Sequence, residues 1–363
     1  MRIGILSAEL GEEDVHENKR LSREIRRRGH SVQIINYRKT IVVATKNRRL
    51  LYQPDKKGQL HQVRVDAVIP RINEADEQSV NLAAFALEGL IANGVYSTAS
   101  PQSIRLAKNK IGSLMAMAEA GLPIPRSAAI TGAGSYEIDI DKALKKVEPN
   151  PNKRLIVKTN IGTQGKGVMS ARSGGEARAI VQGFLANGIP ILLQEFIEPT
   201  KNNHYKDIRI IVVGGRAVGA MERISSRKDE IRANLSLGGK GLQYELSEHE
   251  AGLAEKAAKA LGLNVAGVDI VPSGSKRVII EVNTSPGFII EDISGVNIAK
   301  KIVQLAVAGA RRGEKTKRQK FIEELNKPIH FKPISAGAVG LSRKGSLKPL
   351  ASVKRAIRKR SVA

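Results

Sequence analysis

Residues 278–287 read VIIEVNTSPG and lie near the end of the part of the chain with a regular apolar pattern. Three β-branched residues lead into Glu-x-Asn, and a Pro-Gly pair follows, which is typical of a strand that ends in a turn. Side chains two positions apart point to the same face of a strand, so Glu281 and Asn283 are expected to point together. On so apolar a strand they indicate a partner that compensates for desolvation, such as a hard cation.

A second apolar strand is predicted just upstream. Residues 265–271 read VAGVDIV, with one carboxylate, Asp269, in the run. If the two strands pair across the turn at 272–277, Asp269 joins Glu281 and Asn283. Two ordinary strands with outward polar side chains are the alternative at this point.

The composition sets the broad class. At 363 residues and 41% apolar content, the chain is long enough for two or three domains with real cores, as in a globular protein. The absence of cysteine excludes disulfides, thiolate catalysis and cysteine-based zinc sites. The opening run MRIGIL is too short for a signal peptide, and no window reaches membrane-spanning length. We therefore expect a cytoplasmic protein without a membrane partner.

Charge is the strongest compositional signal. The net charge of +25 predicts attraction to nucleic acid, acidic peptides or polyanionic small molecules. Residues 311–363 hold 16 lysines and arginines against 3 acidic residues, a net of +13. Half of the excess positive charge therefore lies in this tail. Gly, Ser and Pro separate its apolar residues, so it is expected to be disordered.

The chain opens with strand, helix and strand patterns at residues 2–7, 12–28 and 31–36. This βαβ start predicts an α/β domain with a parallel sheet. A hairpin excursion at 50–65, a strand at 66–72 and a helix at 76–93 follow. No glycine fingerprint follows the first strand, which argues against a Rossmann dinucleotide site.

The next part is expected to begin with one helix from Ser100 to about residue 120, carrying Lys108 and Lys110. Strands are predicted at 126–131, 154–159 and 168–172, with helices at 139–147 and 176–187. Between the last two strands, residues 160–167 read NIGTQGKG. Its backbone amides and hydroxyl can face phosphate, although a plain glycine-rich hairpin is an equal alternative.

Further on, the strand at 191–197 ends in Gln-Glu-Phe-Ile. Residues 207–213 and 217–224 form a predicted hairpin around Gly-Gly, with Asp207 and Arg209 on one face. These two could also be an ordinary surface pair worth under about 1 kcal/mol. Helices are expected at 247–261 and 293–310.

Together these features suit the handling of ATP with magnesium. Magnesium prefers a few carboxylates and phosphate oxygens, and lysines act as point charges for phosphates. No covalent nucleophile stands out, since Gly-x-Ser-x-Gly is missing, and the six histidines form no metal-spaced pair. The expected mechanism is electrostatic stabilisation of a phosphoryl transfer.

The order of these motifs resembles the ATP-grasp ligases and, within them, the RimK group of ribosomal protein S6 glutamate ligases. The match covers roughly residues 1–310 and stops before the tail. The motifs are Lys110, Lys158, GTQGKG at 162–167, QEFI at 194–197, DIR at 207–209, RANL at 232–235, AGVD at 266–269 and EVNTSPG at 281–287.

The resemblance implies an α/β (α+β) chain with an ATP-grasp fold and an N-terminal parallel-sheet domain. It divides the chain into an N-terminal α/β domain (1–100), a central ATP-grasp subdomain with a glycine-rich lid loop (101–190), a C-terminal ATP-grasp subdomain with a metal site (191–310) and the basic tail (311–363). It also implies a homo-oligomer.

The implied reaction uses ATP and Mg²⁺ or Mn²⁺, with two ions expected. ATP phosphorylates the C-terminal carboxylate of a protein similar to ribosomal protein S6, and the amine of glutamate attacks the acyl phosphate. Arg209, Arg232 and Asn234 would steady the transferring phosphoryl group, and Asp269, Glu281 and Asn283 would hold the metal. The residues expected to contact ATP are Lys110, Lys158, Gly162, Thr163, Gln164, Gly165, Gly167, Glu195, Phe196, Asp207, Arg232 and Asn234.

The alternatives concern the substrate and the presence of catalysis. The same chemistry could act on a small cofactor or on an amino-group carrier protein, and Leu237 replaces the basic residue expected after Asn-Leu. A non-catalytic protein that binds RNA or the ribosome on an ATP-grasp scaffold is the competing class. In either case the basic tail could dock on ribosomal RNA or the ribosome.

Overall fold

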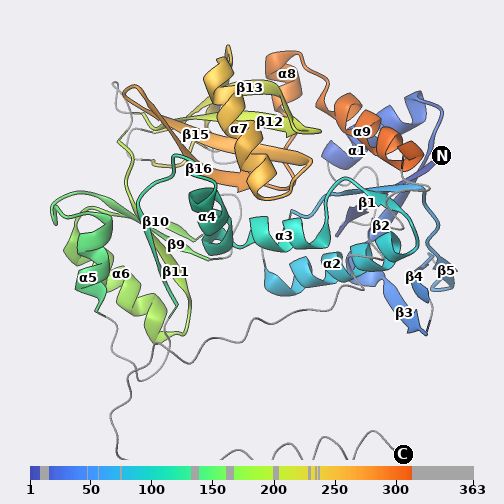
Figure 1. Ribbon diagram of the computed structural model, residues 1–363, viewed down its shortest axis with the longest axis horizontal. Helices are drawn as coiled ribbons and strands as arrows, with labels where there is room; N and C mark the ends of the chain where they lie inside the picture. The colour runs from blue at the N-terminus through green and yellow to red at the C-terminus, as the bar shows by residue number, and fades with distance from the viewer. Residues whose placement is uncertain are drawn as a thin grey trace, which may run out of the picture. The chain divides into compact units, whose positions relative to one another are not determined.

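The computed structural model describes residues 1–8, 16–46, 48–55, 57–73, 76–131, 139–160, 167–198, 204–227, 230–233, 235 and 238–312. Four sheets and the helices packed on them make up this part of the chain (Figure 1). The predicted α/β class is confirmed.

The first sheet is parallel, as the βαβ pattern predicts, and has the strand order β2-β1-β6-β7. Apolar side chains bury β1 on both sides, with Ile3 and Ile5 fully covered. Its elements are β1 (Arg2–Ser7), α1 (His16–Arg27), β2 (Ser31–Asn36), β6 (Ala67–Pro70), α2 (Glu77–Ala92) and β7 (Tyr96–Ser97).

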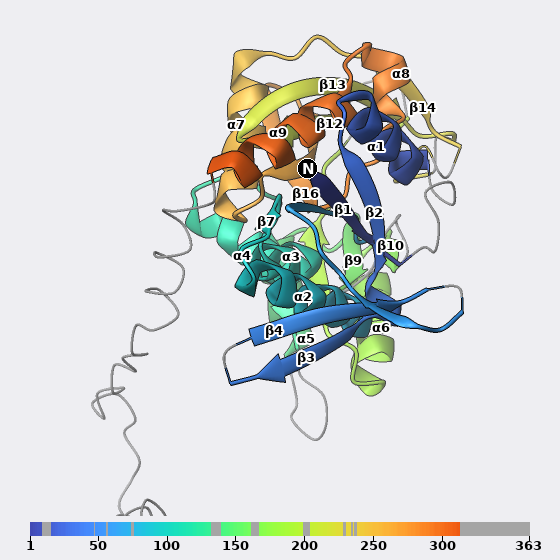
Figure 2. The ribbon, with the colours of Figure 1, turned by 90° about the vertical axis from the view of Figure 1, so that its right-hand side faces the viewer.

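The hairpin predicted at 50–65 is confirmed, and a strand that was not predicted, β3, joins it in a small antiparallel sheet with the order β3-β4-β5. A 3-10 turn, η1 (Tyr37–Lys39), leads into it. Figure 2 shows β3 as the outermost strand, beyond β4. The strands are β3 (Ile41–Thr45), β4 (Arg48–Pro54) and β5 (Leu60–Gln62).

The single helix expected from Ser100 to about residue 120 is wrong: it is two helices, α3 (Pro101–Lys108) and α4 (Lys110–Glu119). Asn109 between them has extended backbone, with ψ 109°, and its side chain accepts a hydrogen bond from the Gly112 N–H at 2.7 Å. An Asn side chain that caps a helix start in this way competes with continuing the previous helix. As a result, Lys110 opens a new helix.

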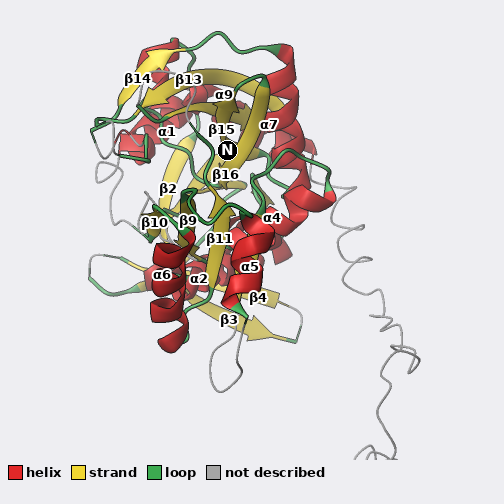
Figure 3. Cartoon of the chain, turned by 90° about the vertical axis from the view of Figure 1, so that its left-hand side faces the viewer, coloured by secondary structure: helices red, strands yellow, loops and turns green. Residues whose placement is uncertain are grey.

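The third sheet has the order β10-β9-β11-β8 and is antiparallel through all its pairs. Helices α5 and α6 lie along one side of it (Figure 3), where Leu144 and Val181 pack against Val157 and Leu193. Its elements are β8 (Ser127–Ile130), α5 (Ile140–Val147), β9 (Leu155–Thr159), β10 (Val168–Ala171), α6 (Gly174–Ala186) and β11 (Ile191–Glu195).

The fourth sheet has the order β14-β13-β12-β15-β16, and helix α7 packs its Leu253 and Ala257 into the core under it. The predicted pairing of the two acidic strands is confirmed, because Asp269 on β15 lies directly opposite Glu281 on β16. Its elements are β12 (Lys206–Val213), β13 (Arg216–Ile224), β14 (Lys240–Gln243), α7 (Glu248–Ala260), β15 (Val265–Ser273) and β16 (Lys276–Asn283).

The helix predicted at 293–310 is also divided, into α8 (Ile290–Ser294) and α9 (Ile298–Arg312). Gly295 ends α8 in the left-handed region at φ 69°, which glycine adopts without steric cost. Helix α9 then buries Ile302 and Val303 in one core with Ile3 and Ile5 of the first sheet. The last described helix therefore completes the core of the first domain (Figure 1).

Gly309 on α9 gives a stability prediction. A Cβ at this position would overlap the ring of Tyr96 on β7. Overpacking of this kind costs about 1–3 kcal/mol, more than the roughly 1 kcal/mol that alanine gains over glycine in a helix. Gly309→Ala is therefore expected to lower the thermal midpoint, measured by circular dichroism.

The matched control is Gly183→Ala on α6, where a Cβ meets nothing within 4 Å. This substitution is expected to leave the thermal midpoint unchanged or raise it. A Gly309→Ala protein that melts with or above the wild type would contradict the proposed close packing of α9 on β7.

Candidate active site

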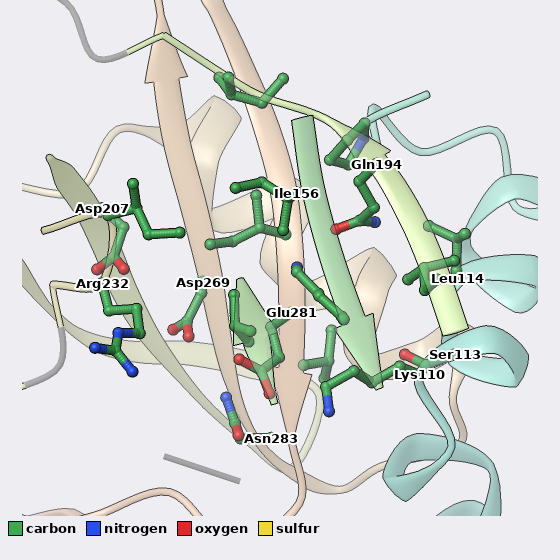
Figure 4. A pocket seen from close by; sticks show the side chains of 18 of the residues that line it. Lys110, Ser113, Leu114, Ile156, Gln194, Asp207, Arg232, Asp269, Glu281 and Asn283 are labelled. Atoms are coloured by element: carbon green, nitrogen blue, oxygen red, sulfur yellow. The ribbon is translucent and has the colours of Figure 1, made fainter. Parts of the chain in front are cut away.

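One pocket collects most of the residues that the sequence singles out. Its walls come from α4, the third sheet and the fourth sheet, and Figure 4 shows it from close by. Nine predicted site residues line it: Lys110, Lys158, Glu195, Phe196, Asp207, Arg232, Asp269, Glu281 and Asn283.

Five of the predicted residues lie outside the described part of the chain: Gly162, Thr163, Gln164, Gly165 and Asn234. The same holds for Leu237 and for the tail from residue 313. Gly167 closes the glycine-rich loop at φ 72°, and a Cβ there would overlap Thr159 Oγ1. Glycine is therefore required at this position by both backbone conformation and space.

Glu281 and Asn283 lie on the same strand, β16, and both face the pocket (Figure 4). Within the described residues, the Glu281 carboxylate has no hydrogen bond and no ion pair. Asn283 Nδ2 is buried without a hydrogen-bond partner. Buried polar atoms are rarely left unpartnered without a functional reason, so this end of the strand is suited to binding a ligand.

Asp269 differs from these two because its carboxylate is engaged. Arg209 binds it through two hydrogen bonds, from Nε to Oδ1 and from Nη2 to Oδ2 at 2.8 Å. Arg223 Nη2 lies 3.0 Å from Asp269 Oδ2. Burial alone would raise the pKa of the Asp269 carboxyl, but the two arginines outweigh burial and hold that pKa below its ordinary value.

Arg223 is a residue that the sequence analysis did not single out. It donates to both oxygens of Asp207, at 2.6 and 2.8 Å, and lies directly opposite Asp207 in the hairpin. With Asp269 and Arg209 it forms a buried network, which we call the β12–β15 charge network. The alternative of a surface pair between Asp207 and Arg209 is therefore wrong, since each aspartate pairs with arginine inside the sheet.

A β-bulge explains why this pair could not be found from the hairpin pattern. Between Ile211 and Val212 the register shifts by one residue. Counting back from the Gly-Gly turn without a bulge would place Glu222 opposite Asp207, in a pair of like charges. With the bulge, Arg223 takes that place.

Two lysines line the same pocket as the acidic strands. Lys110 Nζ donates to the Thr159 carbonyl at 3.2 Å, and burial lowers its pKa while Glu281 opposes this. Lys158 on β9 is more strongly affected, since burial lowers its pKa to about 8 despite Glu281. The pocket therefore holds two desolvated ammonium groups together with Glu281, whose carboxylate has no hydrogen bond or ion pair within the described part of the chain.

The end of the pocket near β11 has a different character. Glu195 accepts hydrogen bonds from Arg126 N at 2.9 Å and Arg126 Nε at 2.7 Å, so its carboxylate is engaged. The guanidinium of Arg154 lies 4.9 Å from the centroid of the Phe196 ring, and the Tyr205 ring lies 6.2 Å from it. An apolar wall with aromatic edges suits a flat heterocycle.

Arg232 lies on the opposite side of the pocket from Lys110 (Figure 4). Glu230 accepts hydrogen bonds from its Nε at 2.7 Å and its Nη2 at 2.8 Å. This hydrogen bonding raises the pKa of Arg232, which therefore stays cationic.

The turn after Asn283 is fixed by the first domain. Arg71, buried and stacked 5.0 Å from the Phe288 ring centroid, donates to the Pro286 carbonyl at 2.9 Å. The Ile72 N–H donates to Ser285 Oγ at 2.9 Å. Sequence reasoning noted the strand with Arg71 but not this contact, which joins residues 215 positions apart.

Two absences hold for the described residues. They contain no group of three or more His, Cys, Asp or Glu placed to hold a metal. The predicted metal ligands Asp269, Glu281 and Asn283 comprise two carboxylates and one amide. None of the described helices has the length and hydrophobicity that a membrane crossing needs.

Two protein-family models match the chain. The RimK PreATP-grasp domain matches residues 1–104, and the RimK-like ATP-grasp domain matches residues 107–306. Together they include both sheets of the pocket and the parallel sheet before it.

Curated proteins agree with the family models. A probable alpha-L-glutamate ligase of Thioalkalivibrio sulfidiphilus is 34% identical over 313 residues, which is 86% of this chain and 97% of that protein. A protein of the same description from Picosynechococcus is 32% identical over 88% of this chain and 100% of its own length.

Solved structures show the same fold at lower identity. The ATP-grasp ligase PsnB complexed with a minimal precursor has a TM-score of 0.63 at 19% identity, covering 85% of this chain and 98% of its own. The D-alanine–D-alanine ligase of Bacillus anthracis complexed with ATP has a TM-score of 0.59 at 15% identity, covering 88% and 99%. The predicted ATP-grasp fold is thereby confirmed, and the chain belongs to the RimK-like ATP-grasp family of ligases.

Proposed function

We propose that this protein is an ATP- and Mg²⁺-dependent ligase that joins the amine of glutamate to a carboxylate acceptor. The observation that carries the proposal is the Glu281 carboxylate, unpaired among the described residues, beside the unpartnered Nδ2 of Asn283, in a pocket that Lys110 and Lys158 also line. Curated relatives named probable alpha-L-glutamate ligases support glutamate as the amine donor.

Mg²⁺, or Mn²⁺ in its place, fits the acidic end of the pocket. Glu281 offers a carboxylate without another partner, and turning the Asn283 amide by 180° would present its oxygen in place of the unpartnered Nδ2. Asp269 would complete the set for two ions through oxygen lone pairs that its arginines leave open. When bound, the metal supplies neutralisation of phosphate charge.

The nucleotide would lie between the third and fourth sheets. Lys110 and Lys158 would bind its phosphates, as would the loop that holds Gly162, Thr163, Gln164, Gly165 and Gly167. Phe196 and the backbone beside Glu195 would take the adenine edge. Asp207 accepts two hydrogen bonds from Arg223 and would hold the part of the pocket wall that lies near the ribose.

The reaction would proceed in two steps. A carboxylate oxygen of the acceptor attacks the γ-phosphorus of ATP, and ADP leaves. The amine of glutamate then attacks the carbonyl carbon of the acyl phosphate, phosphate leaves, and the nitrogen loses a proton as the amide forms. Arg209, Arg232 and Asn234 would stabilise the negative charge that develops on the phosphoryl group and the acyl phosphate.

For the acceptor we propose the C-terminal carboxylate of a protein of the ribosomal protein S6 kind, approached in the cytoplasm. The division at residues 100, 190 and 310 and contact of the basic tail with ribosomal RNA belong to the same proposal. The net charge of +13 over residues 311–363 supports attraction to a polyanion.

Intact-mass spectrometry tests the acceptor. The protein is incubated with ATP, Mg²⁺, glutamate and a cell extract, and one small ribosomal protein is expected to gain mass in glutamate increments. Omitting glutamate or Mg²⁺ should abolish the gain. ADP release without any protein gaining mass would overturn the protein acceptor and leave a small cofactor.

Glu281→Gln tests the catalytic proposal. The change removes the charge of the unpaired carboxylate while keeping its shape, and we expect kcat for ADP release to fall about a hundredfold or more. Glu245→Gln, at an exposed position outside the pocket, is the matched control and should stay near the wild-type rate. Wild-type rates in Glu281→Gln at all Mg²⁺ concentrations would exclude the proposed metal role.

The lowered pKa of Lys158 predicts that ATP binding depends on pH. Its pKa of about 8 means that the ammonium is charged below pH 8 and neutral above it. Because only the cation attracts phosphate, the Kd for Mg-ATP, measured by calorimetry from pH 7 to 9.5, is expected to rise above pH 8.

Lys158→Arg provides the comparison. A guanidinium stays charged over the whole range, so the Kd of this variant should depend less on pH even if it is weaker overall. Equal pH profiles for the two proteins would show that Lys158 does not bind phosphate.

A further inference from the structure

Tyr205 lines the candidate active site, yet the reaction proposed above gives its hydroxyl no role. The residue comes directly before β12, and its backbone continues the pairing with the neighbouring strand. Its C=O accepts from the Ser225 N–H at 2.9 Å, and its N–H donates to Ser225 Oγ at 3.0 Å. Because side chains alternate along an extended strand, Tyr205 lies on the same face as Asp207, which also lines the pocket.

The phenol ring lies where the aromatic end of the pocket meets the acidic end. Its centroid is 6.2 Å from that of the Phe196 ring, and the two rings are tilted by 37°. The carboxylates of Asp207 and Asp269 are close enough to act on the phenol electrostatically. Tyr205 is therefore in reach of a ligand that spans both ends of the pocket.

The Tyr205 hydroxyl forms no hydrogen bond with any residue that the structure describes. Burial, with Asp207 and Asp269 nearby, raises the pKa of this phenol, so its O–H stays protonated and able to donate. The two carboxylates accept from arginines instead, Asp207 from Arg223 and Asp269 from Arg209. Tyrosine hydroxyls in buried surroundings usually have a partner, so a bound ligand is expected to supply the acceptor.

A nucleotide in the pocket would bring ribose oxygens to this place. Its base would lie beside Phe196 and its phosphates beside the two pocket lysines, so its ribose would lie between these groups. Asp207 can only accept hydrogen bonds while it is ionised, and both of its oxygens already accept from Arg223. The Tyr205 hydroxyl supplies the donor that a ribose oxygen needs.

We propose that the Tyr205 hydroxyl donates a hydrogen bond to a ribose hydroxyl oxygen of ATP and thereby makes the protein prefer ribonucleotides to deoxynucleotides. The assignment rests on the proposed function, since it requires ATP in this pocket. It adds a specificity-determining residue to that function. Adenine nitrogens and phosphate oxygens are the other acceptors that a nucleotide offers, and the experiment separates them from the ribose.

The experiment compares nucleotides that differ by a single hydroxyl. Calorimetry measures the Kd for the Mg²⁺ complexes of ATP, 2′-deoxy-ATP and 3′-deoxy-ATP, without glutamate or an acceptor. The wild type is expected to bind at least one deoxynucleotide about three- to tenfold more weakly than ATP, the range for one neutral hydrogen bond. Tyr205→Phe should bind ATP as weakly as that deoxynucleotide, whose own Kd should change by less than about twofold.

Tyr52→Phe is the matched control. Tyr52 is a half-buried tyrosine on β4 that does not line this pocket, and its loss of a hydroxyl should leave the Kd for all three nucleotides unchanged. Because the Tyr205 hydroxyl has no partner in the described part of the chain, Tyr205→Phe is also expected to melt at the wild-type temperature.

Three results would overturn the ribose contact while leaving the proposed function in place. They are a wild type that binds all three nucleotides equally, equal discrimination by the wild type and Tyr205→Phe, and the same loss of affinity for all three nucleotides in the variant. A wild type that binds no Mg-ATP would overturn the proposed function together with this assignment, so the two failures can be told apart.

Discussion

The β12–β15 charge network is the constraint on which the candidate site depends. Asp207, Arg223, Asp269 and Arg209 lie inside the fourth sheet, and all but Arg209 are nearly inaccessible to solvent. Burying charges costs several kcal/mol per ion unless each finds its partner, and losing one partner typically costs about 3–5 kcal/mol. Strands β12, β13 and β15 are therefore fixed in one register. The strand beside them, β16, inherits its position from that register and presents Glu281 to the pocket.

The division of roles between the two acidic strands follows from this network. Asp269 is held as a carboxylate by two arginines, whereas Glu281 has no ion pair among the described residues and interacts electrostatically with Lys110 and Lys158. One carboxylate is thus a structural anchor that borders the pocket, and the other is available to a ligand. The sequence assigns Asp269 and Glu281 the same role because it does not show which carboxylate already accepts hydrogen bonds from neighbouring side chains.

The sequence patterns predicted those features of the fold that neighbouring residues determine. The strand alternation and the short turn at 272–277 were enough to pair the two acidic strands, but Asp269 lies opposite Glu281 only because the register shifts between Asp269 and Ile270. They could not show the bulge at Ile211, which exchanges Glu222 for Arg223 opposite Asp207, or the bond from Arg71 to Pro286 across 215 residues. Helix breaks at Asn109 and Gly295 were missed because the helical pattern continues on both sides, while capping contacts decide the ends.

Helix α9 has a consequence for the order in which the protein can form. The core of the first domain contains Ile3 and Ile5 from the start of the chain and Ile302 and Val303 from α9. During synthesis the first parallel sheet is translated early, yet Leu21 and Ile25 of α1 cover only part of its apolar face until nearly three hundred further residues have been added. Domains generally fold as they emerge, but the core of this one is complete only once α9 has been made. Contacts between residues so far apart in the sequence slow folding, because the entropy of closing a long loop has to be overcome before they form.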